Sequence, residues 1–571
     1  DRMKISVYFT AERIQKYLSE TGLTEETVEL LRRAGVSKVF LEARRGGVST
    51  SKDLLRSLRD AFQARGFETA GGIMTIQMNG EFGTPAGGPE CRSGLLCFSS
   101  LMTRTVLETE IRKLARLFDE IIVDDAFLTP CRCALCRKER QDMDWTEFRR
   151  DLMLRVSRDH ILTPARQENP QCRVIIKFPQ YYDRYELFGY DPKGQTEAFD
   201  TIWAGTETRD PYTLAFGHVP QYEGYFHYRW LRDIGREKLE GAWFDFLECT
   251  PDLFKDQVFT TALAGPDEIT LFCFGPEIFS ANNPLLNVLE KTVPELEALA
   301  CSPEDRQGVD FYMPVNRIGD GDLFIGDYLG MWGIPLCPRS RFPENSRALI
   351  LPSRAAGDPD IAGQTARILE RGGTVLMTSA FLSALPVDSA LFEIAGLEPE
   401  GVFRIRSTVR RIETEEASET VEPFDLPCDM TVRDAEILIH AVIRMPVFGE
   451  IREPVELRVP LLTRFEYGKG SVLVLNMGSC FHSDYRIEES LNFPLVPPVM
   501  NPPQIVMDTV RRYLLEALGM QLDAPYGVAM VPQKDRVVLV NYRDDETAVS
   551  LNGEPARLSP HSWKEFRKPV F

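Results

Sequence analysis

The chain has 571 residues, of which 43% are hydrophobic and 26% are charged. This length exceeds what one hydrophobic core organises, so we expect a globular protein of about two to four domains. The net charge of −19 excludes nucleic acid as a partner, because binding phosphates requires a basic surface. Because no run of about eighteen apolar residues occurs, we also expect no membrane insertion.

The first residues of the chain leave its compartment open. The chain begins at Asp1 rather than Met and enters an apolar segment almost at once. No signal peptide is visible, which fits either a trimmed chain or one whose leader was removed. A cytoplasmic location and a periplasmic or secreted one, after removal of a leader, both remain possible.

Strand-like and helix-like segments alternate over residues 1–290. The expected strands cover residues 5–10, 38–43, 69–76, 120–127, 173–180, 200–207, 241–248 and 268–275. Their apolar residues are consecutive, which is typical of parallel strands covered on both faces. Of the amphipathic helices between them, one is expected to begin at Thr24 and to stop at Gly35. Eight strands alternating with helices over about 250 residues predict a (β/α)8 TIM barrel, with a doubly wound open sheet as the alternative.

The character of the sequence changes near residue 305. A strand at 347–353, a helix at 360–373 and a strand at 374–379 predict a further α/β unit. Residues 410–425 are acidic, and we expect an irregular insertion there. A hairpin is expected at 465–478.

The end of the chain has a different pattern again. A helix is expected at 502–519, and the last fifty residues alternate polar and apolar positions between turn residues. This alternation predicts a small antiparallel β domain of the sandwich type. We therefore expect three domains, at 1–300, at 301–520 with the insertion near 400–460, and at 521–571.

Three cysteines stand within six positions after the fourth expected strand: Cys131, Cys133 and Cys136. Thiolates bind zinc tetrahedrally, and a structural site needs four protein ligands. The candidates for the fourth are Cys91, which we select, and Cys97, both in the segment after the third expected strand. We therefore expect a structural zinc that ties these two loops together, with unrelated free cysteines as the alternative. No sequence motif indicates an organic cofactor.

The Cys-x-Cys-x-x-Cys run, with a further cysteine about forty residues upstream, resembles the zinc cluster of the family 42 glycoside hydrolases, which are β-galactosidases. This resemblance implies a barrel, then a flavodoxin-type, amidotransferase-like α/β domain, then a small β domain. It also implies a carbohydrate substrate and a zinc outside the chemistry. The second domain has no cysteine where an amidotransferase nucleophile would stand. We therefore expect that domain to be a scaffold or the surface of a homo-oligomer.

Catalytic residues of barrel enzymes lie at the C-terminal ends of the strands. Six acidic residues are expected there: Glu42, Asp124, Asp125, Glu207, Asp245 and Glu248. Glycoside hydrolysis needs two carboxyl groups, one to protonate the leaving oxygen and one to attack carbon or activate water. We assign these roles to Asp125 or Asp124 together with Glu207. Asp245 and Glu248 are held in reserve, and Glu42 is expected to bind a sugar hydroxyl.

The sequence departs from family 42 at the fourth strand, where that family has Asn-Glu and this chain has Asp124 and Asp125. Here the chain is similar to several barrel α-glycosidase families, in which a nucleophilic Asp ends strand 4 and the acid/base ends strand 6. Adjacent strand residues point to opposite faces, so we expect only Asp125 to face the substrate. The alternatives are a loop cap or salt bridge for the aspartates and a solvated loop acid for Glu207.

Other side chains near the strand ends are predicted to contact the substrate: Trp203, Trp243, Tyr181, Arg209 and His227. Aromatic faces stack on sugar rings, although core packing is the alternative for each ring and a structural role is the alternative for the histidine. The sequence therefore predicts a glycoside hydrolase, exo-acting on a small oligosaccharide or glycoside. A catalytically inactive carbohydrate-binding or assembly protein on the same scaffold is the alternative.

Overall fold

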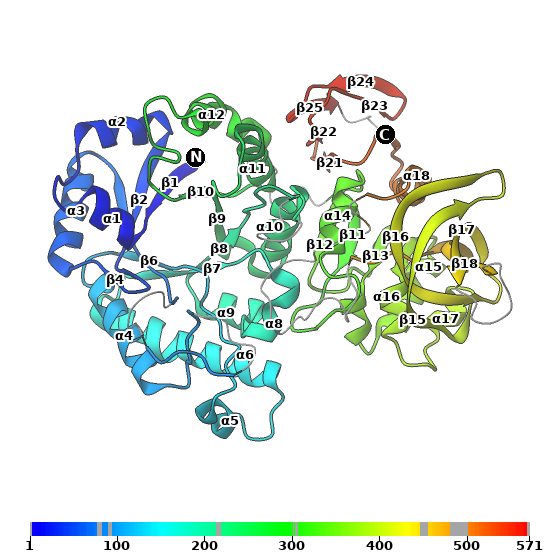
Figure 1. Ribbon diagram of the computed structural model, residues 1–571, viewed down its shortest axis with the longest axis horizontal. Helices are drawn as coiled ribbons and strands as arrows, with labels where there is room; N and C mark the ends of the chain where they lie inside the picture. The colour runs from blue at the N-terminus through cyan, green and yellow to red at the C-terminus, as the bar shows by residue number, and fades with distance from the viewer. Residues whose placement is uncertain are drawn as a thin grey trace. The chain divides into compact units, whose positions relative to one another are not determined.

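The computed structural model describes residues 3–76, 83–88, 94–212, 219–300, 302, 307–445, 455–479, 499 and 501–567. The chain divides into two compact units. The first comprises Asp1–Pro211 and Glu223–Pro303, and the second comprises Tyr212–Tyr222 with most of the chain from Glu304 onward. Both units can be followed by colour in Figure 1.

Eight parallel strands of the first unit form a closed barrel in the order β1-β10-β9-β8-β7-β6-β5-β2 (Figure 1). The strands are β1 (Lys4–Phe9), β2 (Val36–Glu42), β5 (Glu68–Ile73), β6 (Glu120–Val123), β7 (Arg173–Phe178), β8 (Thr201–Gly205), β9 (Leu239–Asp245) and β10 (Glu268–Phe272). Because β1 pairs with both β2 and β10, the sheet has no free edge. The predicted (β/α)8 barrel is confirmed, and the open sheet is excluded.

Helices connect the barrel strands, and one short hairpin follows β2. The hairpin is β3 (Arg44–Arg45) and β4 (Val48–Ser49). The helices are α1 (Ala11–Tyr17), α2 (Glu25–Arg33), α3 (Lys52–Ala64), α4 (Leu101–Ala115), α5 (Ala134–Arg140), α6 (Trp145–Val156), α7 (Thr163–Glu168), α8 (Tyr185–Phe188), α9 (Pro192–Ala198), α10 (Tyr222–Gly235), α11 (Pro251–Ala264), α12 (Pro284–Thr292) and α13 (Leu296–Leu299). Helix α2 begins as expected, because the Thr24 side chain accepts from the N–H of Thr27 at 3.2 Å.

Aromatic side chains fill the barrel interior, and Trp203 is one of them. The indole is 1% exposed, its N–H donates to the Thr270 hydroxyl at 2.9 Å, and its ring lies 6.5 Å from that of Phe40. A Cβ atom on Gly241 would lie 1.9 Å from this ring, so the neighbouring strand must have glycine there. Trp203 therefore belongs to the barrel core. The sugar contact that we expected for Trp203 stays a prediction.

The second unit contains a nine-stranded mixed sheet in the order β12-β11-β13-β14-β19-β18-β17-β15-β16. Its strands are β11 (Val309–Tyr312), β12 (Leu336–Arg339), β13 (Ala348–Leu351), β14 (Thr374–Thr378), β15 (Leu397–Glu413), β16 (Ser418–Val432), β17 (Glu436–Met445), β18 (Val455–Tyr467) and β19 (Gly470–Leu475). Its helices are α14 (Ile325–Met331), α15 (Ile361–Glu370), α16 (Ser379–Ser383), α17 (Leu391–Ile394) and α18 (Gln504–Glu516). The first five strands in this order, β12, β11, β13, β14 and β19, pair in parallel. The pairs that involve β18, β17, β15 and β16 are antiparallel.

The acidic segment 410–425 is not irregular, contrary to our expectation. It forms the tip of the hairpin between β15 and β16, whose turn is closed by a hydrogen bond from Thr414 N–H to the Ala417 carbonyl oxygen at 2.8 Å. Strand β16 is the last strand of the sheet, and most side chains in its first half are exposed. Charged residues are common on edge strands, where they oppose aggregation, so acidity did not indicate the absence of a strand.

Two small antiparallel sheets end the chain, which confirms the predicted β region. One contains β20 (Leu522–Asp523), β23 (Thr547–Leu551) and β24 (Glu554–Leu558), and the other contains β21 (Val528–Pro532), β22 (Arg536–Asn541) and β25 (Ser562–Arg567). The three domain boundaries that we predicted stay a prediction. Among the described helices, none is long and apolar enough to cross a membrane.

Candidate active site

The two aspartates after the fourth barrel strand lie in the loop beyond it, because β6 ends at Val123. The backbone N–H of Asp124 donates to the carbonyl oxygen of Ile73 on β5 at 2.9 Å. The Asp124 carboxylate in turn accepts from the N–H of Asp125 at 2.7 Å. Ala126 follows with a left-handed φ of 61°, so the backbone turns sharply. The strand alternation that we expected for the pair therefore does not apply.

Lys177, near the end of β7, brings together carboxylates that follow β6 and β8, the strands on either side of β7. Its Nζ lies 2.7 Å from Glu207 Oε1 and 3.3 Å from Asp125 Oδ2, and Asp124 Oδ1 is 3.9 Å away. The side chains of Lys177 and Glu207 are each 2% exposed, whereas that of Asp125 is 26% exposed. Asp125 is therefore the more accessible carboxylate of the aspartate pair.

Glu42, at the end of β2, is fully buried, and both of its carboxylate oxygens are engaged. It accepts from the Tyr8 hydroxyl and the Ala11 N–H, each at 2.7 Å. The Arg45 guanidinium lies 3.0 Å from Glu42 and 2.7 Å from Asp124, so it links β2 to the loop after β6. Glu42 thus holds the protein's own loops through these contacts, and the sugar contact that we expected for it stays a prediction.

Glu207, just after β8, has one carboxylate oxygen that is buried without a hydrogen-bond partner among the described residues, namely Oε2. A Cβ atom on Gly205 would lie 2.6 Å from this oxygen, so the glycine leaves room for the glutamate. A buried polar oxygen without a partner costs free energy unless a ligand satisfies it. Glu207 Oε2 is therefore a buried acceptor whose hydrogen-bonding capacity the described residues leave unused.

Asp245, at the end of β9, is paired with Arg209. The guanidinium binds both carboxylate oxygens, with the shortest contact at 2.6 Å. Gln257 fixes the same region, because its side chain accepts from the N–H groups of Thr208 and Arg209 and donates to the Asp245 carbonyl oxygen at 2.7 Å. Glu248 lies in the following loop, exposed and with a left-handed φ of 58°. Asp245 thus pairs with a guanidinium, and its charge contributes to the raised pKa of Glu207.

The surroundings of the three carboxyls near Lys177 separate their pKa values. Burial raises the pKa of Glu207, and the positive charge of Lys177 only partly opposes this effect. Burial also acts on Asp125, but the charges of Lys177 and Arg45 outweigh it and lower the pKa of Asp125. Burial, together with the charge of Asp125, raises the pKa of Asp124 to about 7. The site therefore favours an ionised Asp125 beside a Glu207 that holds its proton more firmly than a free glutamate.

The other predicted substrate contacts lie at different depths. The ring centroid of Trp243 is 4.9 Å from Lys177 Nζ, so this indole borders the carboxyl group. Tyr181 follows β7 and is 7% exposed, with its ring 6.3 Å from that of Tyr190. His227 is 0% exposed, and both of its ring nitrogens have protein partners. His227 thus has a structural role in these contacts, and the substrate contact that we expected for it stays a prediction.

Three site residues were not identified from the sequence: Arg45, Lys177 and Gln257. A lysine inside the apolar segment "RVIIKF" is itself a signal, because a buried charge needs an opposite charge nearby. Arg45 and Gln257 gave no comparable signal. Each has a partner that the sequence does not connect with it, because Arg45 reaches Asp124 at 79 positions and Gln257 reaches Thr208 at 49.

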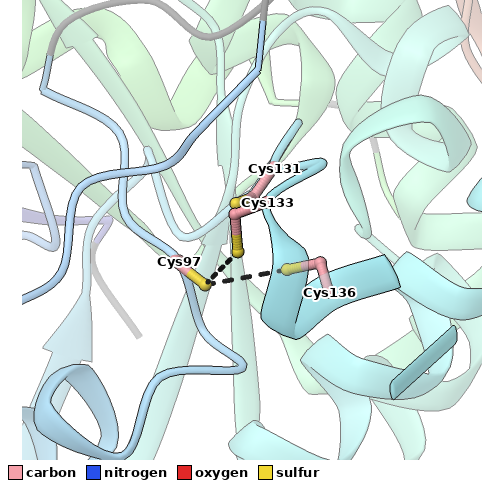
Figure 2. Close-up of side chains that lie close together, drawn as sticks. All are labelled: Cys97, Cys131, Cys133 and Cys136. Atoms are coloured by element: carbon pink, nitrogen blue, oxygen red, sulfur yellow. Dashed lines mark hydrogen bonds between the residues drawn. The ribbon is translucent and has the colours of Figure 1, made fainter. Parts of the chain in front are cut away.

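The predicted cysteine cluster forms where the segment after β5 meets the loop after β6 (Figure 2). The sulfur atoms of Cys97, Cys131, Cys133 and Cys136 all lie within 4.8 Å of one another. Cys97 Sγ lies 3.6 Å from both Cys133 Sγ and Cys136 Sγ. Cys97 is thus the fourth member of this group, and Cys91, our first choice, lies outside the described residues.

These distances fit a tetrahedral thiolate site. Four sulfurs at about 2.3 Å from one zinc ion are about 3.8 Å apart, close to the separations between Cys97 and two of its partners. The backbone N–H of Gly87 donates to Cys131 Sγ at 3.2 Å, a bond that stabilises a thiolate. The four cysteines could therefore hold a metal ion, with no coordination position left for water.

Two protein-family models match separate segments of the chain, and one curated protein matches over a longer stretch. A family model described as "Probable glycosyl hydrolase, catalytic domain" matches residues 1–286. A second model, described as the second domain of the uncharacterized protein SSO3021, matches residues 306–406. SSO3021 of Saccharolobus solfataricus is 25% identical over 373 residues, which is 58% of this chain. The match spans 59% of the length of that relative.

Solved structures share the fold over nearly the whole chain. A catalytic mutant of Gan42B, a GH42 β-galactosidase from G. stearothermophilus, has a TM-score of 0.65 at 12% identity and covers 99% of this chain and 98% of its own. α-L-Fucosidase isoenzyme 2 from Paenibacillus thiaminolyticus has a TM-score of 0.65 at 13% identity and covers 99% of both chains. At these identities the likeness concerns the fold alone. The family match over residues 1–286 shows more: the chain belongs to the family described as "Probable glycosyl hydrolase, catalytic domain", whose model covers the barrel strands.

Proposed function

We propose that the barrel is a retaining glycosidase, with Asp125 as the nucleophile and Glu207 as the general acid/base. One observation carries this proposal: a single buried ammonium, Lys177 Nζ, contacts both carboxylates, at 3.3 Å and 2.7 Å. Their facing oxygens are therefore no more than about 6 Å apart, which favours the roughly 5–5.5 Å separation of retaining enzymes over the wider spacing of inverting ones.

The environment of each carboxyl supports its role. A nucleophile must be ionised, and the nearby cations lower the pKa of Asp125. A general acid must carry a proton, and burial raises the pKa of Glu207. In this proposal the proton is carried by Oε2, which has no hydrogen-bond partner among the described residues, whereas Oε1 faces the Lys177 ammonium.

The substrate in this proposal is a small oligosaccharide or glycoside, cleaved from its end. The support is that two proteins of the same fold are named as a β-galactosidase and an α-L-fucosidase. The border of the site includes one indole, that of Trp243, which gives an apolar surface next to the carboxyls.

We further propose that Cys97, Cys131, Cys133 and Cys136 hold a structural zinc, which the sulfur spacing and the all-thiolate ligand set support. The second domain, which we propose to be amidotransferase-like, serves in this proposal as a scaffold or as the surface of a homo-oligomer.

A panel of 4-nitrophenyl glycosides of both anomers tests the catalytic proposal. Asp125→Asn and Glu207→Gln should each lower kcat by at least about 1,000-fold on the active glycoside, because each removes one of the two required groups. Asp53→Asn and Glu68→Gln are matched controls on exposed residues and should keep full activity. Full activity in both site variants would overturn the assignment. Sugar binding without turnover in the wild type would favour the inactive binding protein.

A further inference from the structure

A buried tyrosine and histidine connect two strand ends at the barrel mouth. Tyr185 belongs to α8 and His227 to α10, and both side chains are 0% exposed. The Tyr185 hydroxyl lies 2.7 Å from His227 Nε2 and also contacts the carbonyl oxygen of Pro179. His227 Nδ1 lies 2.8 Å from the carbonyl oxygen of Gly205. The pair therefore joins the backbone after β7 to the end of β8.

The two carbonyl groups that the pair contacts, those of Pro179 and Gly205, are each two positions in sequence from a charged residue of the proposed site. Pro179 follows Lys177 by two positions, and Gly205 precedes Glu207 by two positions. The ammonium and the carboxylate lie 2.7 Å apart. A change in the spacing of these two backbone segments would therefore change the contact between Lys177 and Glu207.

The hydrogen-bond chemistry determines the protonation of the pair. A carbonyl oxygen only accepts, so His227 Nδ1 carries a proton and donates it to Gly205. Burial lowers the pKa of His227 to about 3, so the ring is neutral and Nε2 accepts from Tyr185. The hydroxyl proton thus has two acceptors, Nε2 and the Pro179 carbonyl oxygen. The nearest charged partner of the ring is Glu223, 3.6 Å from Nδ1.

Aromatic packing keeps both rings in place. The Tyr182 ring is stacked on His227, with centroids 5.4 Å apart and an angle of 20° between the planes. Trp230 is stacked on Tyr185 in the same way, at 6.3 Å and 28°. Close-packed rings cannot turn to replace a lost hydrogen bond, so the connection is rigid.

We propose that Tyr185 and His227 act as positioning residues that set the place of Glu207 relative to Lys177. This inference rests on the proposed function, in which Glu207 donates the proton to the leaving group. A general acid must lie within hydrogen-bond reach of the leaving oxygen, and small displacements of it are costly. Neither ring touches the reacting atoms, so their loss should affect the proton transfer and little else.

The experiment compares two leaving groups on the sugar that the glycoside panel identifies. A phenyl glycoside needs protonation of its leaving oxygen, whereas a 2,4-dinitrophenyl glycoside does not. Tyr185→Phe and His227→Leu should lower kcat/KM on the phenyl glycoside by about 10–100-fold. On the 2,4-dinitrophenyl glycoside kcat/KM should fall by less than about threefold, because kcat/KM reports formation of the glycosyl-enzyme, and this leaving group needs no proton in that step.

Two further variants separate positioning from simple loss of structure. His227→Gln keeps one donor and one acceptor and should recover most of the activity that His227→Leu loses. Tyr228→Phe removes a hydroxyl from a fully buried tyrosine on the same helix, whose charged neighbours are Arg232, Asp267 and Arg229 instead. It should leave the ratio of the two leaving groups unchanged.

Equal losses on both leaving groups, or unchanged activity in Tyr185→Phe and His227→Leu, would refute the positioning role. Glu207→Gln keeps the two failures apart. If Glu207→Gln is inactive on the phenyl glycoside while the two positioning variants are normal, only this inference fails. If Glu207→Gln is fully active, or no glycoside is hydrolysed by the wild type, the proposed function fails and the positioning role falls with it.

Discussion

The cluster of carboxylates around Lys177 (Asp124, Asp125 and Glu207) and the cysteine cluster both include residues of the loop that follows β6. The two clusters differ in how the chain assembles them. Three of the four cysteines come from one stretch of six residues, and the fourth, Cys97, comes from the preceding βα segment. The residues of the carboxylate cluster, with Lys177, come from the C-terminal ends of β6, β7 and β8. A site made of near neighbours is visible in the sequence, whereas a site made by closing a barrel is visible only in part.

The two groups also differ in how they are stabilised. The positive charge of Lys177 balances the negative charge of the carboxylates inside the protein, so the protonation of each carboxyl depends on its neighbours. The thiolates repel one another and need a cation from outside. Changing a charge in the first group should therefore alter chemistry, and removing the cation from the second should alter stability.

The largest effect is expected from removing the shared cation with Lys177→Met. The charge of Lys177 lowers the pKa of both Asp125 and Glu207, so its loss raises both. The activity rises with pH as Asp125 ionises and falls as Glu207 loses its proton, so both limbs of the kcat/KM profile should move to higher pH. We expect kcat near pH 6 to fall by about 100-fold, because less Asp125 is ionised and an uncompensated acid cluster remains.

The pH profile of kcat/KM is measured from about pH 4 to pH 9 on the active 4-nitrophenyl glycoside. The control is Lys255→Met, which replaces a lysine on α11, outside the site, and should leave the profile unchanged. Limbs that stay in place, or that move to lower pH, would contradict the arrangement in which one ammonium serves both carboxyls.

A smaller effect, and one of a different kind, is expected from the cysteine cluster. Purified protein should contain one zinc per chain, and Cys133→Ser should abolish it. Loss of the metal should lower the Tm by about 5–10 °C, because binding free energy of the metal is folding free energy. The activity of the fraction that stays folded should change by less than about threefold, because the thiolates leave no open position for chemistry.

Cys172→Ser is the matched control, since Cys172 is a buried free cysteine outside the cluster. Its metal content should equal that of the wild type. Absence of any metal from protein prepared under reducing conditions would remove the zinc proposal without touching the carboxyl assignment.

The smallest effect is expected for Glu248→Gln. Glu248 is exposed in the loop after β9, whereas Asp245 three positions earlier is buried and paired with Arg209. We expect activity within about threefold of the wild type and an unchanged Tm, because substitutions at exposed positions usually have little effect. A loss of 100-fold or more on the active glycoside would instead return Glu248 to the set of catalytic candidates.

Particular residues show how far the sequence reaches. The eight barrel strands were located within a few residues, because consecutive apolar residues followed by amphipathic helices repeat along the chain. The aspartate pair and Glu207 were found as acids at strand ends. Their environment was not, since it depends on Arg45 and Lys177, whose partners lie 79 and 30 positions away in the chain.

Sequence pattern does not encode how deeply a side chain is buried. Trp203 and Glu42, which we expected at the barrel mouth, are both buried, and their sugar contacts stay predictions. The acidic segment 410–425 looked irregular but pairs as an edge hairpin. In each case, the neighbours across the sheet determined what the local pattern left open.

The sequence by itself thus determined the barrel, the small antiparallel β region and three of the four clustered cysteines, because each follows from local periodicity or close spacing. Only the tertiary structure decided which carboxyls meet, that Lys177 joins them, that Cys97 completes the cluster and that His227 contacts backbone rather than solvent. Those facts depend on the closure of eight strands, which brings together residues that no short-range pattern connects.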